Sequence, residues 1–294
     1  MMRLVALVVA CCVALSDVAA AQTLDRIAAT KTVRIGFVAD QAPFASKSDN
    51  GAPVGYAIDV CARVVEEIGR RIGQIKPTYV ETTLADAFAA IAADRIDLLC
   101  GATTVTLGRR ETVDFSQPIF LTGASGLLRT DSPRDLRELF LGERTISPPR
   151  SPELRPFATS RVGVRAATTT EAILRRRVVE EGYGAEVMGF ETHAEGLAAL
   201  EARRIDAYVG DRVLLIGLLG AARDPSGLIV GSRLFTREPY GIAMKRGDAD
   251  LRLLADRALS QFYATREFTE LLVKYFGEQA PAIQAQILAQ SASE

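Results

Sequence analysis

The sequence is poor in metal-binding side chains and has no excess of charge of either sign. Its 294 residues include one histidine, His193, four cysteines and no tryptophan. Because two of the cysteines lie in an N-terminal apolar run, the usual zinc and iron sites cannot be assembled. Lysine and arginine number 35 against 36 acidic residues, so the net charge is -1 and the basic surface that binds nucleic-acid phosphates is missing. We expect no metal or other cofactor and no nucleic-acid partner.

Long apolar runs are missing too, except for residues 4–15. This run follows Arg3 and precedes small residues that end at Ala21. It is too short for a transmembrane helix, which needs about 20 apolar residues, and the order of charge, apolar run and small residues is that of a secretory signal. We expect residues 1–21 to be removed and the mature protein to be exported. Lipid attachment at Cys11 is a less favoured alternative.

The remaining sequence has the composition of a globular protein that is long enough for two domains. Residues 33–37 form a short β-prone run, and apolar residues then recur at intervals of four along residues 60–72, which is typical of an amphipathic helix. Residues 83–101 repeat the theme as a helix followed by a buried strand. This alternation predicts an α/β fold.

Two segments of the chain are similar at an offset of 109 residues. Residues 88–101 read FAAIAADRIDLLCG and residues 197–210 read LAALEARRIDAYVG, with seven of fourteen positions identical. The shared Arg-Ile-Asp and final glycine favour a duplicated lobe over two unrelated alanine-rich helices that each enter a strand.

Charged residues of opposite sign follow the two repeated strands. Ligands of open α/β sheets gather at the carboxyl ends of strands. Arg109, which follows the first strand, is suited to bind a carboxylate through paired hydrogen bonds. Asp211 follows the second strand and is suited to accept a hydrogen bond from an ammonium group. Each residue also has a simpler interpretation, Arg109 as a solvated charge and Asp211 as a helix N-cap.

Several motifs that follow one another along the chain carry a resemblance to a known family. The first half contains Gly55-Tyr56-Ala57-Ile58-Asp59, Cys100-Gly101-Ala102-Thr103-Thr104 and Val113-Asp114-Phe115-Ser116-Gln117-Pro118. The second half contains Val162-Gly163-Val164, Thr168-Thr169-Thr170, Arg204-Ile205-Asp206-Ala207 and Tyr240-Gly241-Ile242-Ala243. Together they resemble the bacterial periplasmic amino-acid-binding proteins of ABC transporters, solute-binding protein family 3, and are nearest the glutamate/aspartate branch.

The resemblance implies an α/β, two-lobed periplasmic binding protein fold of type 2, the Venus-flytrap fold, with two hinge crossings. Lobe 1 would comprise residues 22–118 and 241–294, and lobe 2 residues 124–235. The hinge strands would be residues 119–123 and 236–240. Such a protein is a periplasmic monomer without enzymatic activity. It captures a polar or acidic L-amino acid by lobe closure and delivers it to an ABC transporter permease.

The resemblance also implies how each group of the ligand is bound. Arg109, Thr104 and the backbone near Ala102 would bind the α-carboxylate, and Asp211 would bind the α-ammonium group. Tyr56 matches the position of an aromatic ring that often covers the ligand.

The segment Thr168-Thr169-Thr170-Glu171 has the pattern of a helix capping box, and helix N-termini bind anions readily. In the family this turn meets the ligand carboxylate, which implies a contact from Thr169.

Selectivity for the ligand side chain is harder to infer. The position of His193 resembles that of a histidine that approaches the distal carboxylate in the glutamate/aspartate branch. Extra arginines typical of this branch are replaced here, by Val38 and Ala39 among others, and Gln41 stands where an aromatic residue is frequent. Arg165 would supply the missing positive charge, or it is a surface arginine whose stem packs along the lobe.

Cys61 and Cys100 are expected to form a disulfide. Cys61 lies near the start of a helix and Cys100 at the end of the strand that this helix should cover. Export to an oxidising compartment allows the bond. Two free buried cysteines are the alternative.

Two other functions remain open. The family resembles cyclohexadienyl dehydratases, which eliminate water from prephenate-like acids on the same fold, and this chemistry needs a general acid in the cleft. A ligand-sensing partner of a membrane receptor is the second alternative.

Overall fold

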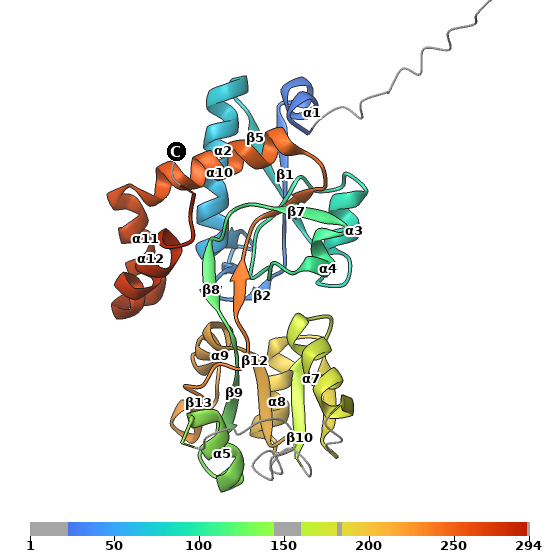
Figure 1. Ribbon diagram of the computed structural model, residues 1–294, viewed down its shortest axis with the longest axis vertical. Coiled ribbons are helices and arrows are strands. Elements are labelled where there is room, and N and C mark those ends of the chain that lie inside the picture. The colour runs from blue at the N-terminus through green and yellow to red at the C-terminus, as the bar shows by residue number, and fades with distance from the viewer. Residues whose placement is uncertain (1–22, 144–159, 181–183, 293–294) are drawn as a thin grey trace, which may run out of the picture.

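The computed structural model describes residues 23–143, 160–180 and 184–292. Two five-stranded sheets, each covered by helices, form separate lobes that are joined by a pair of extended segments (Figure 1). The expected two-lobed α/β fold is confirmed. The predicted signal peptide, residues 1–21, lies outside the described residues.

Lobe 1 is built on a mixed sheet with the strand order β5-β1-β6-β15-β7. Its strands are β1 (Thr32–Phe37), β5 (Lys76–Glu81), β6 (Leu98–Leu99), β7 (Val113–Phe115) and β15 (Ala243–Lys245). Strand β1 is parallel to β5 and β6, whereas β15 is antiparallel to β6 and β7. A small antiparallel sheet comprises β2 (Asp40–Gln41), β3 (Ala45–Lys47) and β4 (Pro53–Val54).

The helices of lobe 1 come from both ends of the chain. They are α1 (Thr23–Thr30), α2 (Tyr56–Ile72), α3 (Ala87–Ala92), α4 (Leu107–Arg110), α10 (Ala249–Tyr263), α11 (Arg266–Phe276) and α12 (Ala280–Leu288). Helix α2 buries the apolar stripe that its four-residue periodicity predicts, and α10 packs against it. The C-terminal segment therefore returns to lobe 1 and completes its core.

Lobe 2 has a sheet with the strand order β11-β10-β12-β9-β13. Its strands are β9 (Ala124–Arg129), β10 (Arg161–Arg165), β11 (Glu186–Phe190), β12 (Ala207–Asp211) and β13 (Leu228–Val230). Its helices are α5 (Arg134–Leu141), α7 (Thr169–Glu180), α8 (His193–Glu201) and α9 (Arg212–Leu219). As in lobe 1, the second strand in the order, here β10, is parallel to both of its neighbours, and the fourth, here β9, is antiparallel to both of its own.

The repeated Arg-Ile-Asp motif has the same structural role in both lobes. In lobe 1, Asp97 accepts hydrogen bonds from the backbone N–H of Arg34 (2.7 Å) and from its Nη2 (2.7 Å). In lobe 2, Asp206 accepts the corresponding bonds from Arg161 (2.9 and 3.0 Å). Each aspartate directly precedes one strand, β6 or β12, and its hydrogen bonds hold that strand beside its parallel partner, β1 or β10. The matching strand orders and these contacts support the duplication inferred from the sequence.

Two short strands connect the lobes. Strand β8 (Phe120–Thr122) pairs with β14 (Glu238–Tyr240) in an antiparallel register that sets Thr122 opposite Glu238 (Figure 1). Side chains alternate along a strand, so Glu238 and Tyr240 point to one side and Pro239 to the other. The ribbon thereby presents one glutamate and one tyrosine at the junction of the lobes.

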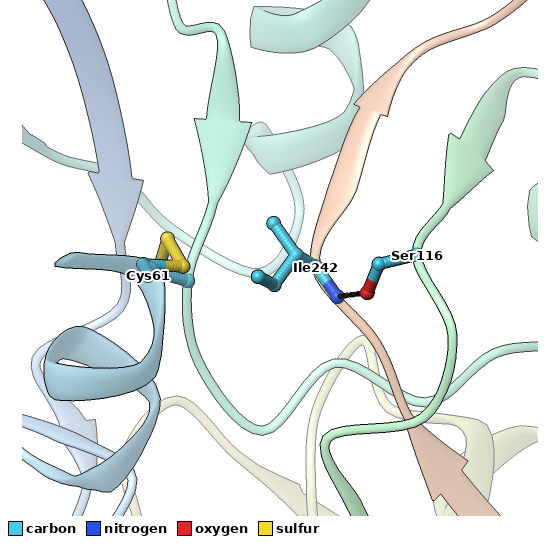
Figure 2. Close-up of a disulfide and its surroundings, with 4 residues drawn as sticks. Cys61, Ser116 and Ile242 are labelled. Carbon is cyan, nitrogen blue, oxygen red and sulfur yellow. Dashed lines mark hydrogen bonds between the residues drawn. A yellow bond between two sulfur atoms is a disulfide. The ribbon is translucent and has the colours of Figure 1, made fainter. Parts of the chain in front are cut away.

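A disulfide joins Cys61 of α2 to Cys100, which directly follows β6 (Figure 2). Both residues are fully buried and lie in the main hydrophobic core of lobe 1. Nearby, the backbone N–H of Ile242 donates to Ser116 Oγ (3.0 Å) and ties together the segments that leave and re-enter the lobe. The expected disulfide is confirmed.

Replacing both cysteines, Cys61→Ala with Cys100→Ala, should lower the free energy of unfolding by about 2–4 kcal/mol. The bond links residues 39 positions apart and so restricts the unfolded chain. Urea unfolding of the two proteins measures the difference. A reductant should destabilise the wild type and leave the double variant unaffected. Equal unfolding midpoints for wild type and variant would contradict the expected contribution.

Candidate functional site

A cavity lies between the lobes at the carboxyl ends of β6, β10 and β12. Lobe 1 contributes Gln41, Leu84, Ala102, Thr104 and Arg109; lobe 2 contributes Arg165, Thr168, Thr169, Thr170, His193, Val209, Gly210, Asp211 and Leu214; and β14 contributes Glu238 and Tyr240. Every ligand contact expected from the sequence lines this cavity except Tyr56. Two residues of opposite charge, Arg109 and Asp211, thus come from different lobes to one cavity.

Tyr56 requires a correction, because it does not lie where it can cover a ligand. Its side chain is fully buried in lobe 1, and its hydroxyl donates to the carbonyl oxygen of Ile119 (2.8 Å). The ring makes edge contacts with Phe44, Phe120 and Phe276 at centroid distances of 5.1–6.0 Å. The first turn of α2 points this ring into an aromatic cluster of the core, which the motif alone does not reveal.

Arg109 is held in one orientation by contacts within lobe 1. Its guanidinium group lies 4.9 Å from the centre of the Phe88 ring, and Nη1 donates to the carbonyl oxygen of Thr104 (2.8 Å). Its backbone N–H donates to Oγ1 of Thr106, the N-cap of α4 (3.1 Å). Burial lowers the pKa of the guanidinium, which nevertheless remains charged. The remaining donors are available to an anion in the cavity.

The backbone near Ala102 is less available than the sequence suggests. The N–H of Ala102 donates to Oε1 of Gln41 (3.0 Å). A Cβ atom at the adjacent Gly101 would lie 2.4 Å from the same oxygen, so glycine is needed for this approach. Gln41 therefore occupies the donor that the family resemblance assigns to the ligand carboxylate.

Asp211 has the structural role that the sequence left open for it, and it also lines the cavity. It is the N-cap of α9, where Oδ1 accepts from the N–H of Val213 (3.2 Å). The two connecting strands, β8 and β14, also hold it, since Thr122 Oγ1 donates to Oδ1 (2.6 Å) and the Tyr240 hydroxyl donates to Oδ2. Burial raises the pKa of this carboxyl group to about 7, and the nearby charge of Glu238 adds to the effect.

Thr169 lies at the first position of α7, as the capping pattern predicts. Thr168 is the residue that caps the helix, because its Oγ1 accepts from the N–H of Glu171 (3.1 Å). Glu171 Oε2 in turn accepts from the N–H of Ala167 (2.9 Å). The hydroxyl of Thr169 is therefore free to reach across the cleft, where it donates to Glu238 (3.1 Å).

Glu238 is the main residue of the site that the sequence analysis missed. Its side chain is buried, and it accepts hydrogen bonds from a threonine of each lobe and from one threonine beside β14. The donors are Thr104 (2.9 Å) and Thr169 (3.1 Å) to Oε2, and Thr236 (2.8 Å) to Oε1. Strand periodicity contained the signal, since residues two apart on a strand share a face and Tyr240 lines the cavity.

The two residues proposed for side-chain selectivity converge on a third, Asp40. Arg165 Nε donates to Asp40 Oδ2 across the cleft (2.9 Å), and the backbone N–H of His193 donates to the same oxygen (3.3 Å). The imidazole Nδ1 of His193 lies 3.0 Å from the Tyr208 hydroxyl. Burial lowers the pKa of His193 to about 4, so its ring is neutral at physiological pH. Neither residue therefore adds a free positive charge to the site.

The lobes are in contact across the cleft. The Arg165–Asp40 ion pair links lobe 2 to lobe 1, and the Thr169–Glu238 hydrogen bond links lobe 2 to β14. The cavity between these parts measures about 40 Å³. Pockets for small organic ligands usually measure about 300–1,000 Å³. The lobes must move apart to admit an amino acid.

The described residues offer little for a metal or for membrane insertion. Within residues 23–143, 160–180 and 184–292, no three histidine, cysteine or acidic side chains are grouped to hold a metal ion. None of the helices in this part of the chain is both long and apolar enough to cross a bilayer. The chemistry of the cavity is that of charged and hydroxyl side chains.

Residues 33–278 match the family of bacterial extracellular solute-binding proteins, family 3. The chain is 27% identical over 263 residues to the L-glutamate/L-aspartate-binding protein of Pseudomonas aeruginosa, which covers 88% of this chain and 81% of that protein. It is 25% identical over 259 residues to the L-arginine-binding protein of the same species, covering 86% and 91%. The resemblance seen in the motifs is confirmed.

Solved structures with the same two-lobed architecture include the ancestral amino-acid-binding protein AncCDT-1, a precursor of cyclohexadienyl dehydratase. The TM-score is 0.72 at 27% identity, covering 87% of this chain and all of that one. An ancestral arginine-binding protein bound to arginine gives a TM-score of 0.69 at 25% identity, covering 84% and 99%.

The buried Asp211 should make the ligand-free protein less stable as the pH rises. Its carboxyl pKa is raised from 3.8 to about 7 in the folded protein, so the folded state binds the proton more tightly than the unfolded state. Between about pH 4 and pH 7, wild type should lose up to about 1.4 kcal/mol per pH unit relative to Asp211→Asn. Urea unfolding of both proteins across this range tests it, and parallel stability curves would contradict it.

Proposed function

Because the chain belongs to the family 3 bacterial extracellular solute-binding proteins, we propose that it binds a free L-amino acid between its lobes and delivers it to an ABC transporter permease in the periplasm. One observation carries the proposal: Arg109 and Asp211, from different lobes, line a single cavity. A zwitterion presents a carboxylate and an ammonium group, which match these two charges.

The arrangement gives each anchor a definite role. Arg109, fixed against Phe88, offers its free N–H donors to the α-carboxylate as charge-assisted hydrogen bonds. Asp211, held by Thr122 and Tyr240, accepts from the α-ammonium group. The ammonium charge compensates a carboxylate that is otherwise destabilised by burial. The relatives named for glutamate/aspartate and arginine support an amino acid as the ligand and leave its side chain open, with a polar or acidic one expected from the motifs.

We propose that the protein binds its ligand without converting it to a product. The elimination catalysed by dehydratases needs a general acid, and Asp211, with its pKa raised to about 7, is the described carboxyl group closest to that requirement. In the proposed complex, however, the ligand ammonium group pairs with Asp211 and keeps it ionised. Incubation with prephenate should therefore yield no product absorbance, and sustained product formation would establish the enzymatic alternative.

Binding should close the protein about β8 and β14. Opening breaks the Arg165–Asp40 and Thr169–Glu238 contacts, and closure around a ligand that touches both lobes restores them and adds the ligand's own contacts. To take the equilibrium from 1:99 to 99:1 closed, the ligand must prefer the closed form by about 5.5 kcal/mol. Small-angle X-ray scattering should show a smaller radius of gyration at saturation. An unchanged radius with a tightly bound ligand would argue against lobe closure.

Removing either anchor should abolish most of the affinity. Arg109→Ala or Asp211→Asn leaves the opposite ligand charge buried without its partner, which costs about 2–5 kcal/mol. This cost corresponds to a Kd that is some thirtyfold to several thousandfold higher. Calorimetric titration with glutamate, aspartate, glutamine, histidine and arginine measures the effect.

The matched control is Arg110→Ala, which removes an exposed arginine of the same short helix outside the cavity. Its affinity should equal that of the wild type. If the wild type binds none of these amino acids but binds a dicarboxylate that has no ammonium group, the proposed role of Asp211 is wrong.

A further inference from the structure

Glu238 is a buried charge that the two-anchor arrangement leaves without a role. Only 4% of its surface is exposed, and it stands on β14, between the lobes. Its carboxylate accepts from one hydroxyl of each lobe, Thr104 and Thr169, and from Thr236. These contacts hold the carboxylate in one position at the cavity, because all three hydroxyl donors point to its oxygens.

These hydrogen bonds also decide what Thr104 and Thr169 offer to a ligand. A threonine hydroxyl has one hydrogen and two lone pairs. In both residues the hydrogen points to Glu238, so only the lone pairs face other groups. The nearby Asp211 Oδ2 accepts a single bond, from Tyr240, and retains accepting capacity. This end of the cavity therefore presents acceptors and suits a hydrogen-bond donor such as an ammonium group.

When Asp211 is ionised, as it is beside the ligand ammonium group in the proposed complex, the charges at the cavity leave an excess of one negative charge. The described side chains that line it include two cations, Arg109 and Arg165, and two anions, Asp211 and Glu238. The third anion, Asp40, pairs with Arg165 at 2.9 Å and neutralises it. Arg109 alone therefore faces two carboxylates.

A zwitterionic backbone does not change this balance. Its carboxylate pairs with Arg109, and its single ammonium group lies near both remaining acids. His193 adds no charge while its ring is neutral. An acidic ligand side chain would place a further negative charge in a small buried space, whereas an uncharged or basic side chain would not.

We propose that Glu238 is a specificity-determining residue of the ligand site, which makes the cleft select amino acids with uncharged polar or basic side chains over acidic ones. This inference rests on the proposed amino-acid-binding function. It narrows the polar or acidic class expected from the sequence to its non-acidic members.

The test compares two ligands of nearly the same shape, glutamine and glutamate, on wild type and Glu238→Gln by calorimetric titration of the full mature chain. Wild type should bind glutamine at least tenfold more tightly than glutamate. In Glu238→Gln this preference should fall at least tenfold, because the surplus negative charge is gone. The ratio of two affinities measured on one sample does not depend on the folded fraction, so it remains valid if the variant is less stable.

Asp256→Asn is the matched control. Asp256 is a partly buried carboxylate of lobe 1 that accepts from the N–H of Gln117 (2.6 Å) and does not line the cavity. The control should keep the wild-type ratio of glutamine to glutamate affinity.

Two results would overturn the inference and leave the proposed function standing: a wild type that prefers glutamate, or a ratio that is unchanged in Glu238→Gln. The second would mean that Glu238 serves only to hold the lobes together. A wild type that binds none of the twenty amino acids would instead refute the proposed function.

Discussion

The burial of two carboxylates at the junction of the lobes is the constraint on which the site depends. A buried ion that lacks partners is strongly destabilising. Asp211 and Glu238 are therefore surrounded by donors, and these come from both lobes and both connecting strands. Because the donors belong to separate parts of the chain, the carboxylates are fully satisfied only when those parts meet. The charged groups that suit the site for a ligand thus also hold together the lobes and strands that line it.

The duplicated scaffold explains how opposite charges reach one cavity. The sheets share their strand order, and Asp97 and Asp206 fix equivalent strands in the same way. The carboxyl ends of β6 and β12 consequently meet across the cleft. Lobe 1 places Arg109 beyond its strand end and lobe 2 places Asp211 at its own. The repeat supplies the geometry, and divergence after each strand supplies the chemistry.

Much of this arrangement was predictable from the sequence, for local reasons. Periodicity revealed the repeated helices and strands, and the positions of Cys61 and Cys100 predicted their disulfide. The failures involve tertiary contacts. Tyr56 belongs to one of the motifs that carry the family resemblance, yet the direction of one helical turn places its side chain in the core. Glu238 was overlooked because two adjacent short strands must pair before its side chain can meet hydroxyls from residues more than 60 positions away.

In the proposed mechanism, charge selection and lobe closure would be coupled through Glu238. Thr169 contacts Glu238 only when lobe 2 approaches β14, so part of the closed form is stabilised before any ligand enters. A ligand shifts the equilibrium only by its difference in affinity between the open and closed forms. An acidic side chain is repelled most strongly when closure excludes water and lowers the effective dielectric constant. It would therefore lose affinity chiefly in the closed form, and the selectivity of the site would be expressed as a failure to close.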